Sequence, residues 1–164
     1  MVTNNCVNTY NHVIQRVSVN KTAVQNITTV IPADDTIPQK AEGDEVLTLA
    51  ITPKKTTNIL VIEFNTMFQI HNNGIACVFA LFQDATANAL SATWTCGAND
   101  LQTDSCYIKH VMVAGTTAAT TFKIRAGKTG ASAFQMTLNG EVTGGGRLFG
   151  GVADTWLTIT EYNA

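Results

Sequence analysis

Short stretches in which apolar and polar residues alternate recur along the chain, and this pattern constrains the fold more than any other feature. Most of the stretches are rich in β-branched or aromatic residues. Alternation with a period of two residues places one set of side chains on each face of a strand. The pattern predicts strands over residues 12–20, 23–31, 45–51, 58–70, 75–83, 106–115, 120–127, 133–140 and 155–162.

Turn signals separate most of these predicted strands. Asn73-Gly74 lies between two of them and Asn139-Gly140 ends another, and Asn-Gly is the pair that tight hairpins favour. No stretch of helical length carries apolar residues at the 3.6-residue period. The sequence therefore predicts an all-β fold, an antiparallel sandwich or barrel.

The chain has 164 residues, which is the length of one domain. Its first 30 residues are polar, rich in asparagine and without glycine. We expect residues 1–30 to form an extended segment that enters from a preceding shaft, and residues 31–164 to form the compact domain. The N-terminal residues lack the basic and apolar blocks of a signal peptide, and no apolar stretch approaches membrane-spanning length. Membrane insertion is therefore not expected.

Charge and motifs argue against nucleic acids and cofactors as partners. The formal net charge is -2, and no basic run exceeds the pair Lys54-Lys55, whereas nucleic-acid binding depends on clustered Lys and Arg. Gly127-Lys128-Thr129 resembles the end of a phosphate-binding loop, but Phe122 stands where that motif requires glycine. The glycine-rich run 144–151 lacks dinucleotide-binding spacing, so we interpret its glycines as conformational.

Residues with catalytic potential are dispersed along the chain. His12, His71 and His110 fall in no motif that places them beside a nucleophile. The acidic pairs Asp34-Asp35 and Asp44-Glu45 lie in predicted turns, where Asp commonly accepts hydrogen bonds from nearby backbone N–H groups. We therefore expect no enzymatic activity. Glycoside hydrolysis by paired carboxylates is the alternative that remains open.

Cys6, Cys77, Cys96 and Cys106 match no zinc-binding spacing, so no metal site is expected. Cys77 lies in an apolar run and is predicted to be buried. Cys96 and Cys106 flank a polar segment, and a disulfide between them would fix that loop. The alternative is that both remain thiols.

The same loop carries the candidate ligand-binding residues. Trp94 and Tyr107 bracket it, and aromatic faces beside amides and carboxylates are typical of sugar-binding surfaces. The polar candidates between the two aromatic residues are Asn99, Asp100, Gln102, Thr103 and Asp104. In the alternative interpretation, Trp94 only packs at the edge of the sandwich.

Four segments of the chain, residues 28–64, 80–92, 111–127 and 144–164, resemble the C-terminal globular knob domains of phage tail fibres and phage-like bacterial fibre proteins. The resemblance implies a jelly roll similar to tumour necrosis factor and C1q domains, assembled as a homotrimer on a coaxial stalk. It places the chain at the tip of a virion tail fibre, or of a fibre at the bacterial cell surface or in the periplasm. The cysteine-flanked segment 96–106 departs from the family and suggests an individual specificity.

The interface of the trimer implied by this resemblance is expected at the glycine-rich bend and the strand after it. The expected interface residues are Arg147, Phe149, Trp156, Leu157 and Ile159. The expected function is non-enzymatic binding of a cell-surface receptor, a glycan or an outer-membrane protein, for recognition of host or prey. The alternatives are a structural knob that drives trimerisation and caps the fibre, and a polysaccharide depolymerase.

Overall fold

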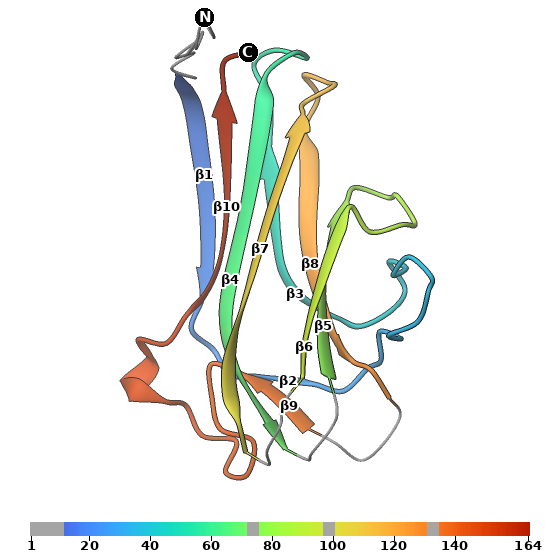
Figure 1. Cartoon of the computed structure of the whole chain (residues 1–164). Helices are drawn as coiled ribbons and strands as arrows, with labels where there is room; N and C mark the ends of the chain where they lie inside the picture. The colour runs from blue at the N-terminus through green and yellow to red at the C-terminus, as the bar shows by residue number, and fades with distance from the viewer. Residues whose placement is uncertain (1–11, 72–75, 97–100, 131–134) are drawn as a thin grey trace, which may run out of the picture.

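The chain folds into two antiparallel β-sheets that pack face to face (Figure 1). A computed structural model describes residues 12–71, 76–96, 101–130 and 135–164. The predicted all-β fold is confirmed, and within these ranges no helix is long and apolar enough to span a bilayer. The elements are β1 (Val13–Lys21), β2 (Gln25–Ile27), β3 (Asp44–Ile51), β4 (Ile59–His71), β5 (Ala76–Gln83), β6 (Ser91–Cys96), β7 (Thr103–Val113), β8 (Thr120–Lys128), β9 (Gln135–Leu138), the short 3-10 turn η1 (Phe149–Gly151) and β10 (Thr155–Tyr162).

The strand order is that of a jelly roll. Sheet A has the order β1-β10-β4-β9-β2, with β7 pairing along the other side of β4, and sheet B has the order β3-β8-β5-β6. The chain crosses between the sheets after β2, β3, β4, β6, β7 and β8. Such crossings wind the strands into the Greek keys from which a jelly roll is built.

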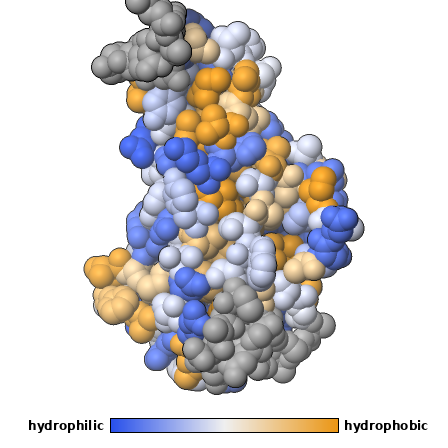
Figure 2. Space-filling view, in the orientation of Figure 1, coloured by the Kyte–Doolittle hydropathy of each residue, from blue (hydrophilic) through white to orange (hydrophobic). Residues whose placement is uncertain are grey.

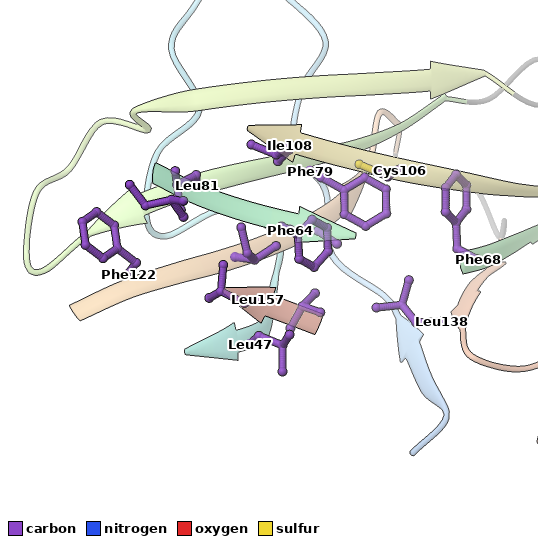
Figure 3. Close-up of a cluster of buried hydrophobic side chains, with 14 of the residues drawn as sticks. Leu47, Phe64, Phe68, Phe79, Leu81, Cys106, Ile108, Phe122, Leu138 and Leu157 are labelled. Carbon is purple, nitrogen blue, oxygen red and sulfur yellow. The ribbon is translucent and has the colours of Figure 1, made fainter. Parts of the chain in front are cut away.

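The core lies between the two sheets and consists of the inward-facing residues of both. β4 alternates between buried and half-buried residues along its whole length, as expected for a strand with one face in the core. The Phe79 ring lies 5.8 Å from that of Phe64 and 5.3 Å from that of Phe68, both in tilted arrangements that aromatic pairs favour. Figure 3 shows these rings among Leu47, Leu81, Cys106, Ile108, Phe122, Leu138 and Leu157.

The outer face of sheet B carries a second apolar cluster. Val78, Ala80 and Phe82 alternate with the core residues of β5 and are buried with Ile31, which precedes β3. The segment that joins β2 to β3 therefore covers part of this face. β5 is buried on both sides as a result, which explains why its sequence is apolar without alternation.

Ile31 is held against the backbone by two glycines. A Cβ atom at Gly127 would lie 2.5 Å from Ile31 Cγ1 and 2.6 Å from the Ile31 nitrogen, and one at Gly43 would lie 2.7 Å from Ile31 Cδ1. The Ile31 N–H also donates to the Lys128 carbonyl over 3.0 Å. The covering segment can approach sheet B this closely because these positions lack a side chain.

The expected domain boundary at residue 31 falls inside the sandwich. β1 pairs with β10 from Val13 to Lys21, and β2 pairs with β9. Ile27 is part of the core. The strands before residue 31 are extended, as expected, but they are part of the domain because their partners lie near its C-terminal end. Residues 1–11 lie outside the described ranges.

A buried carboxylate holds the loop between β3 and β4. Glu161 accepts hydrogen bonds at Oε1 from the Lys54 N–H (2.7 Å) and Asn58 Nδ2 (2.6 Å), and at Oε2 from Gln15 Nε2 (2.6 Å). Burial raises its pKa, but the hydrogen bonds from Asn58, Gln15 and the backbone of Lys54 and Lys55 outweigh burial and hold the pKa below its ordinary value of 4.5. Ionised Glu161 therefore stabilises the folded state.

Replacing Gly127 with alanine is expected to destabilise the fold by about 1–3 kcal/mol, because the new methyl group overlaps the backbone of Ile31. The matched control is Gly130→Ala, since a Cβ there would meet no atom of the described chain within 4 Å. Thermal and denaturant unfolding measure both variants. Equal stability of the two would contradict the packing of Ile31 onto Gly127.

Replacing Glu161 with glutamine is expected to cost roughly 1–3 kcal/mol at pH 7, because hydrogen-bond donors would then face an amide that cannot satisfy them all. The folded-state pKa is depressed, so the contribution of Glu161 is present above pH 4.5 and is lost as the pH falls through the folded-state pKa. The stability difference between wild type and variant should therefore shrink on acidification. Melting curves from pH 7 to about pH 3 test this, with Glu63→Gln on the outer face of β4 as the control. A difference that does not vary with pH would disprove the assignment.

Candidate binding groove

A groove runs along the outer face of sheet B, between the segment that covers this sheet and strand β6. Its volume is about 520 Å³, which lies within the range of small-molecule sites. One wall comes from the covering segment, and the rest comes from β5 and β6. The residues that line it are Pro32, Ala33, Asp34, Thr36, Pro38, Ala76, Val78, Ala92, Thr93 and Trp94.

Trp94 contributes the aromatic surface of the groove. It pairs with Val78 across β5 and β6, so its side chain lies on the outer face of sheet B. The side chain is 65% exposed. This exposure favours a role in contacts over the alternative in which Trp94 only packs at the edge of the sandwich.

Asp34 contributes the carboxylate. Its Oδ1 accepts a hydrogen bond from the Thr36 N–H over 2.9 Å and another from the Thr36 hydroxyl. This is the local capping expected for an Asp in a turn. The hydrogen bonds from Thr36, side chain first and then backbone, lower the pKa of Asp34, and burial opposes them only weakly. The carboxylate is therefore ionised at neutral pH.

Hydrogen bonds fix the wall formed by the covering segment at both of its ends. At one end, Ile31 is bonded to Lys128 as described above. At the other end, the Ala89 N–H donates to the Pro38 carbonyl over 3.0 Å, and Gln39 Nε2 donates to Asn88 Oδ1 over 3.0 Å. A wall that is ordered before a ligand arrives lowers the entropic cost of binding.

The structure does not bring Trp94 and Tyr107 together. Tyr107 lies on the outer face of sheet A, where its hydroxyl donates to Glu63 Oε1 over 2.6 Å. That hydrogen bond, followed by burial and the charge of Glu63, raises the pKa of Tyr107. Trp94 and Tyr107 lie on the outer faces of opposite sheets, so their rings point to different sides of the sandwich.

The polar candidates between them lie outside the groove or outside the described ranges. Asp104 Oδ2 accepts a hydrogen bond from the Thr95 hydroxyl over 2.7 Å, which links β7 to β6. Thr103 Oγ1 accepts one from Gln69 Nε2 over 3.3 Å, and the Gln102 carbonyl accepts one from the Ile70 N–H. These contacts are structural links at the edge of the sandwich. Asn99 and Asp100 fall in residues 97–100, which the structure does not describe.

Cys106 is a buried free thiol, which agrees with the alternative in which no disulfide joins Cys96 and Cys106. β7 directs Cys106 into the core, where it packs with Ile108 and the aromatic side chains. β6, which carries Cys96, belongs to the opposite sheet, and the Cys96 side chain is not described. Burial, and secondly the charge of Asp104, raise the pKa of Cys106 to about 12. Cys77 is buried, as predicted.

Two of the five expected interface residues are core residues. Leu157 and Ile159 are 0% exposed and point between the sheets, so the expectation that they form a trimer contact is wrong. The side chains of β10 alternate, and the sequence did not show which set faces inward. Trp156 is half-buried on the outer face of sheet A, while Arg147 is exposed.

Phe149 is exposed as well, with 69% of its surface accessible. It has a φ of 50°, and Gly150 and Gly151 follow with φ values of 64° and 92°. A phenylalanine with positive φ is uncommon and costs backbone energy. The bend nevertheless exposes Phe149 and Val152 together, and Figure 2 shows that this part of the chain projects as a hydrophobic lobe. The conformational role expected for the glycines is confirmed here.

Sequence reasoning missed the groove wall from Pro32 to Pro38. It interpreted Asp34 as a capping residue, which is correct, but nothing local indicates that this turn lies across sheet B. The signal is non-local, because it depends on Ile31 fitting over Gly127, which lies far along the chain. In the part of the chain that the structure describes, no three or more His, Cys, Asp or Glu side chains gather as metal ligands would.

Cys106 is expected to resist alkylation in the native protein at pH 8, because it is buried and its pKa is about 12. It should react fully once the protein is unfolded in denaturant. Peptide mass spectrometry after iodoacetamide treatment measures both states. Native labelling of Cys106, or a linked Cys96–Cys106 peptide under non-reducing conditions, would contradict the structure.

No protein-family model and no curated protein matches the chain. Among solved structures, it is similar to Eiger TNF from S. frugiperda, with 10% identity and a TM-score of 0.47 over 91% of this chain and 93% of that one. It is also similar to a chain of the infectious bursal disease virus Gt strain, with 13% identity and a TM-score of 0.44, and to the VP2 subviral particle of that virus, with 12% and 0.37. In both viral cases the match covers 92% of this chain but only 38% of the other. The jelly-roll assignment itself rests on the strand order and pairing of this chain.

Proposed function

We propose that this jelly roll is a non-enzymatic receptor-binding tip of a fibre, and that it binds a cell-surface glycan in the groove beside Trp94. The observation that carries the proposal is the exposed Trp94 ring in the same groove as a fixed, ionised carboxylate on Asp34. An indole face covers the apolar C–H face of a sugar ring, while a carboxylate accepts hydrogen bonds from its hydroxyls. The β-sandwich beneath keeps both groups in place.

The fibre context and the homotrimer are supported by the resemblance of residues 28–64, 80–92, 111–127 and 144–164 to fibre knob domains. The exposed Phe149 and Arg147 provide an apolar and a charged contact on one projecting segment. Three copies on one stalk would present three grooves, and weak single sites would then gain avidity. The proposed location is a virion tail fibre or a fibre tip at the bacterial surface or in the periplasm.

The second candidate function is a structural knob that drives trimerisation and caps the fibre without binding a ligand. The exposed hydrophobic lobe around Phe149 and Val152 favours it, because contact between copies would bury that lobe. Depolymerase activity is disfavoured, since Asp34 is the single carboxylate among the described residues that line the groove. Glycoside hydrolysis ordinarily uses two carboxylates.

Replacing Trp94 with alanine is expected to weaken glycan or cell binding at least about tenfold, because exposed aromatic contacts dominate such sites. The melting temperature and the trimer mass should stay close to wild type, since the ring packs little against the sandwich. Tyr107→Ala is the matched control, an exposed aromatic residue on the other sheet. A glycan array, whole-cell binding and light scattering provide the three measurements.

Each outcome of this experiment separates the candidate functions. Loss of binding in Trp94→Ala but not in Tyr107→Ala supports the groove as the receptor site. Equal binding by both variants places the site elsewhere, and binding to an outer-membrane protein but to no glycan overturns the glycan assignment. A wild-type trimer that binds neither glycan nor cells leaves the structural knob as the function, and a monomeric mass overturns the trimer and its avidity.

A further inference from the structure

We propose that the groove selects neutral sugars and rejects acidic ones, because Asp34 provides a fixed negative charge on its wall. This proposal rests on the glycan-binding function proposed above and adds the class of sugar. Among the described residues that line the groove, Asp34 alone is charged, and the others are proline, alanine, valine, threonine and tryptophan. The lining therefore offers an anionic sugar a repelling charge and no compensating cation.

One oxygen of the Asp34 carboxylate, Oδ1, accepts hydrogen bonds from the protein, and the other, Oδ2, is available to a ligand. Thr36 donates both its backbone N–H and its hydroxyl to Oδ1 of Asp34. Within the described chain, no hydrogen bond to Oδ2 accompanies them, although an ionised carboxylate has the capacity to accept several. Oδ2 is thus the acceptor for sugar hydroxyl groups.

The uncharged walls make this selection stronger than it would be on an open surface. Ala33, Pro32 and Pro38 stand beside Asp34, and Trp94 and Val78 belong to the sheet side of the groove. A sugar that stacks on Trp94 displaces water from these apolar surfaces, and the desolvated groove screens charge less than bulk water does. A carboxylate or sulfate on that sugar would lose hydration without gaining a partner.

Coulomb's law gives the order of magnitude of this repulsion for two charges in close contact. Two like charges about 4 Å apart repel enough, even at the dielectric constant of water, to weaken binding about fivefold. Added salt reduces this repulsion, since the screening length is about 8 Å at physiological ionic strength. We therefore expect about a fivefold preference for a neutral sugar at low salt, decreasing as salt is added.

Asp34→Asn isolates the charge from the shape of the turn. Asparagine has the same outline, and its Oδ1 accepts a hydrogen bond from a backbone N–H two residues on, so the turn at Thr36 is retained. Asp35→Asn is the matched control, because it removes the same charge from an exposed neighbour that does not line the groove. Melting temperatures of both variants verify that the fold is intact.

The probes are pairs of oligosaccharides that differ only in carrying a hexose or the corresponding hexuronate at one position. The dissociation constants of each pair are measured by calorimetry for wild type, Asp34→Asn and Asp35→Asn, at low and at physiological salt. The neutral-to-acidic preference should be about fivefold in wild type at low salt and smaller at physiological salt. In Asp34→Asn it should be close to one at both. Asp35→Asn should retain the wild-type preference.

Equal binding of both sugars by wild type overturns the proposal, as does a preference that Asp34→Asn and Asp35→Asn both retain. These outcomes leave glycan binding itself in place. Failure of the proposed function gives a different result. Wild type would then bind no member of any pair, or the Trp94→Ala variant would bind the sugars as tightly as wild type does. That result overturns the selectivity together with the site.

Discussion

The packing of Ile31 onto the bare backbone of Gly127 and Gly43 is the interaction on which the rest of the structure depends. It attaches the segment between β2 and β3 to the outer face of sheet B and closes the second apolar cluster over Val78, Ala80 and Phe82. Without this attachment, β5 would expose a hydrophobic face. The groove would also lose the wall that carries Asp34. Stability and the candidate site therefore share one physical origin.

The alternating pattern was sufficient to predict most of the strands, because one face of nearly every strand lies in the core. β6 was missed because it is an edge strand whose largest side chain, Trp94, faces outward. The domain boundary was misplaced for a different reason. β1 pairs with β10 from the far end of the chain, and local sequence carries no signal of that distant partner.

The site was only partly predictable for the same physical reason. An exposed tryptophan beside polar residues identified Trp94, but the residues around it came from the wrong segment. The chain crosses from sheet B to sheet A between β6 and β7, which separates Trp94 from Tyr107 although they are close in sequence. The crossing of the covering segment over sheet B instead brings Asp34 into the groove. In a jelly roll, proximity is decided by the connections between sheets, so neighbours in sequence are a poor guide to neighbours in space.

The pairing of β1 with β10 also determines how the domain would carry a mechanical load. The Asn163 N–H donates to the His12 carbonyl over 2.9 Å, so the chain enters and leaves the described sandwich at the same end (Figure 1). In the proposed fibre, tension between a stalk at that end and a receptor held in the groove would pull β1 along its own axis. The hydrogen bonds of an antiparallel ladder lie perpendicular to the strands, so such a pull loads those from Val13 to Lys21 together rather than one after another. Shear of this kind loads many hydrogen bonds at once, whereas peeling breaks them singly, and this would suit the proposed role of holding a fibre to a receptor under tension.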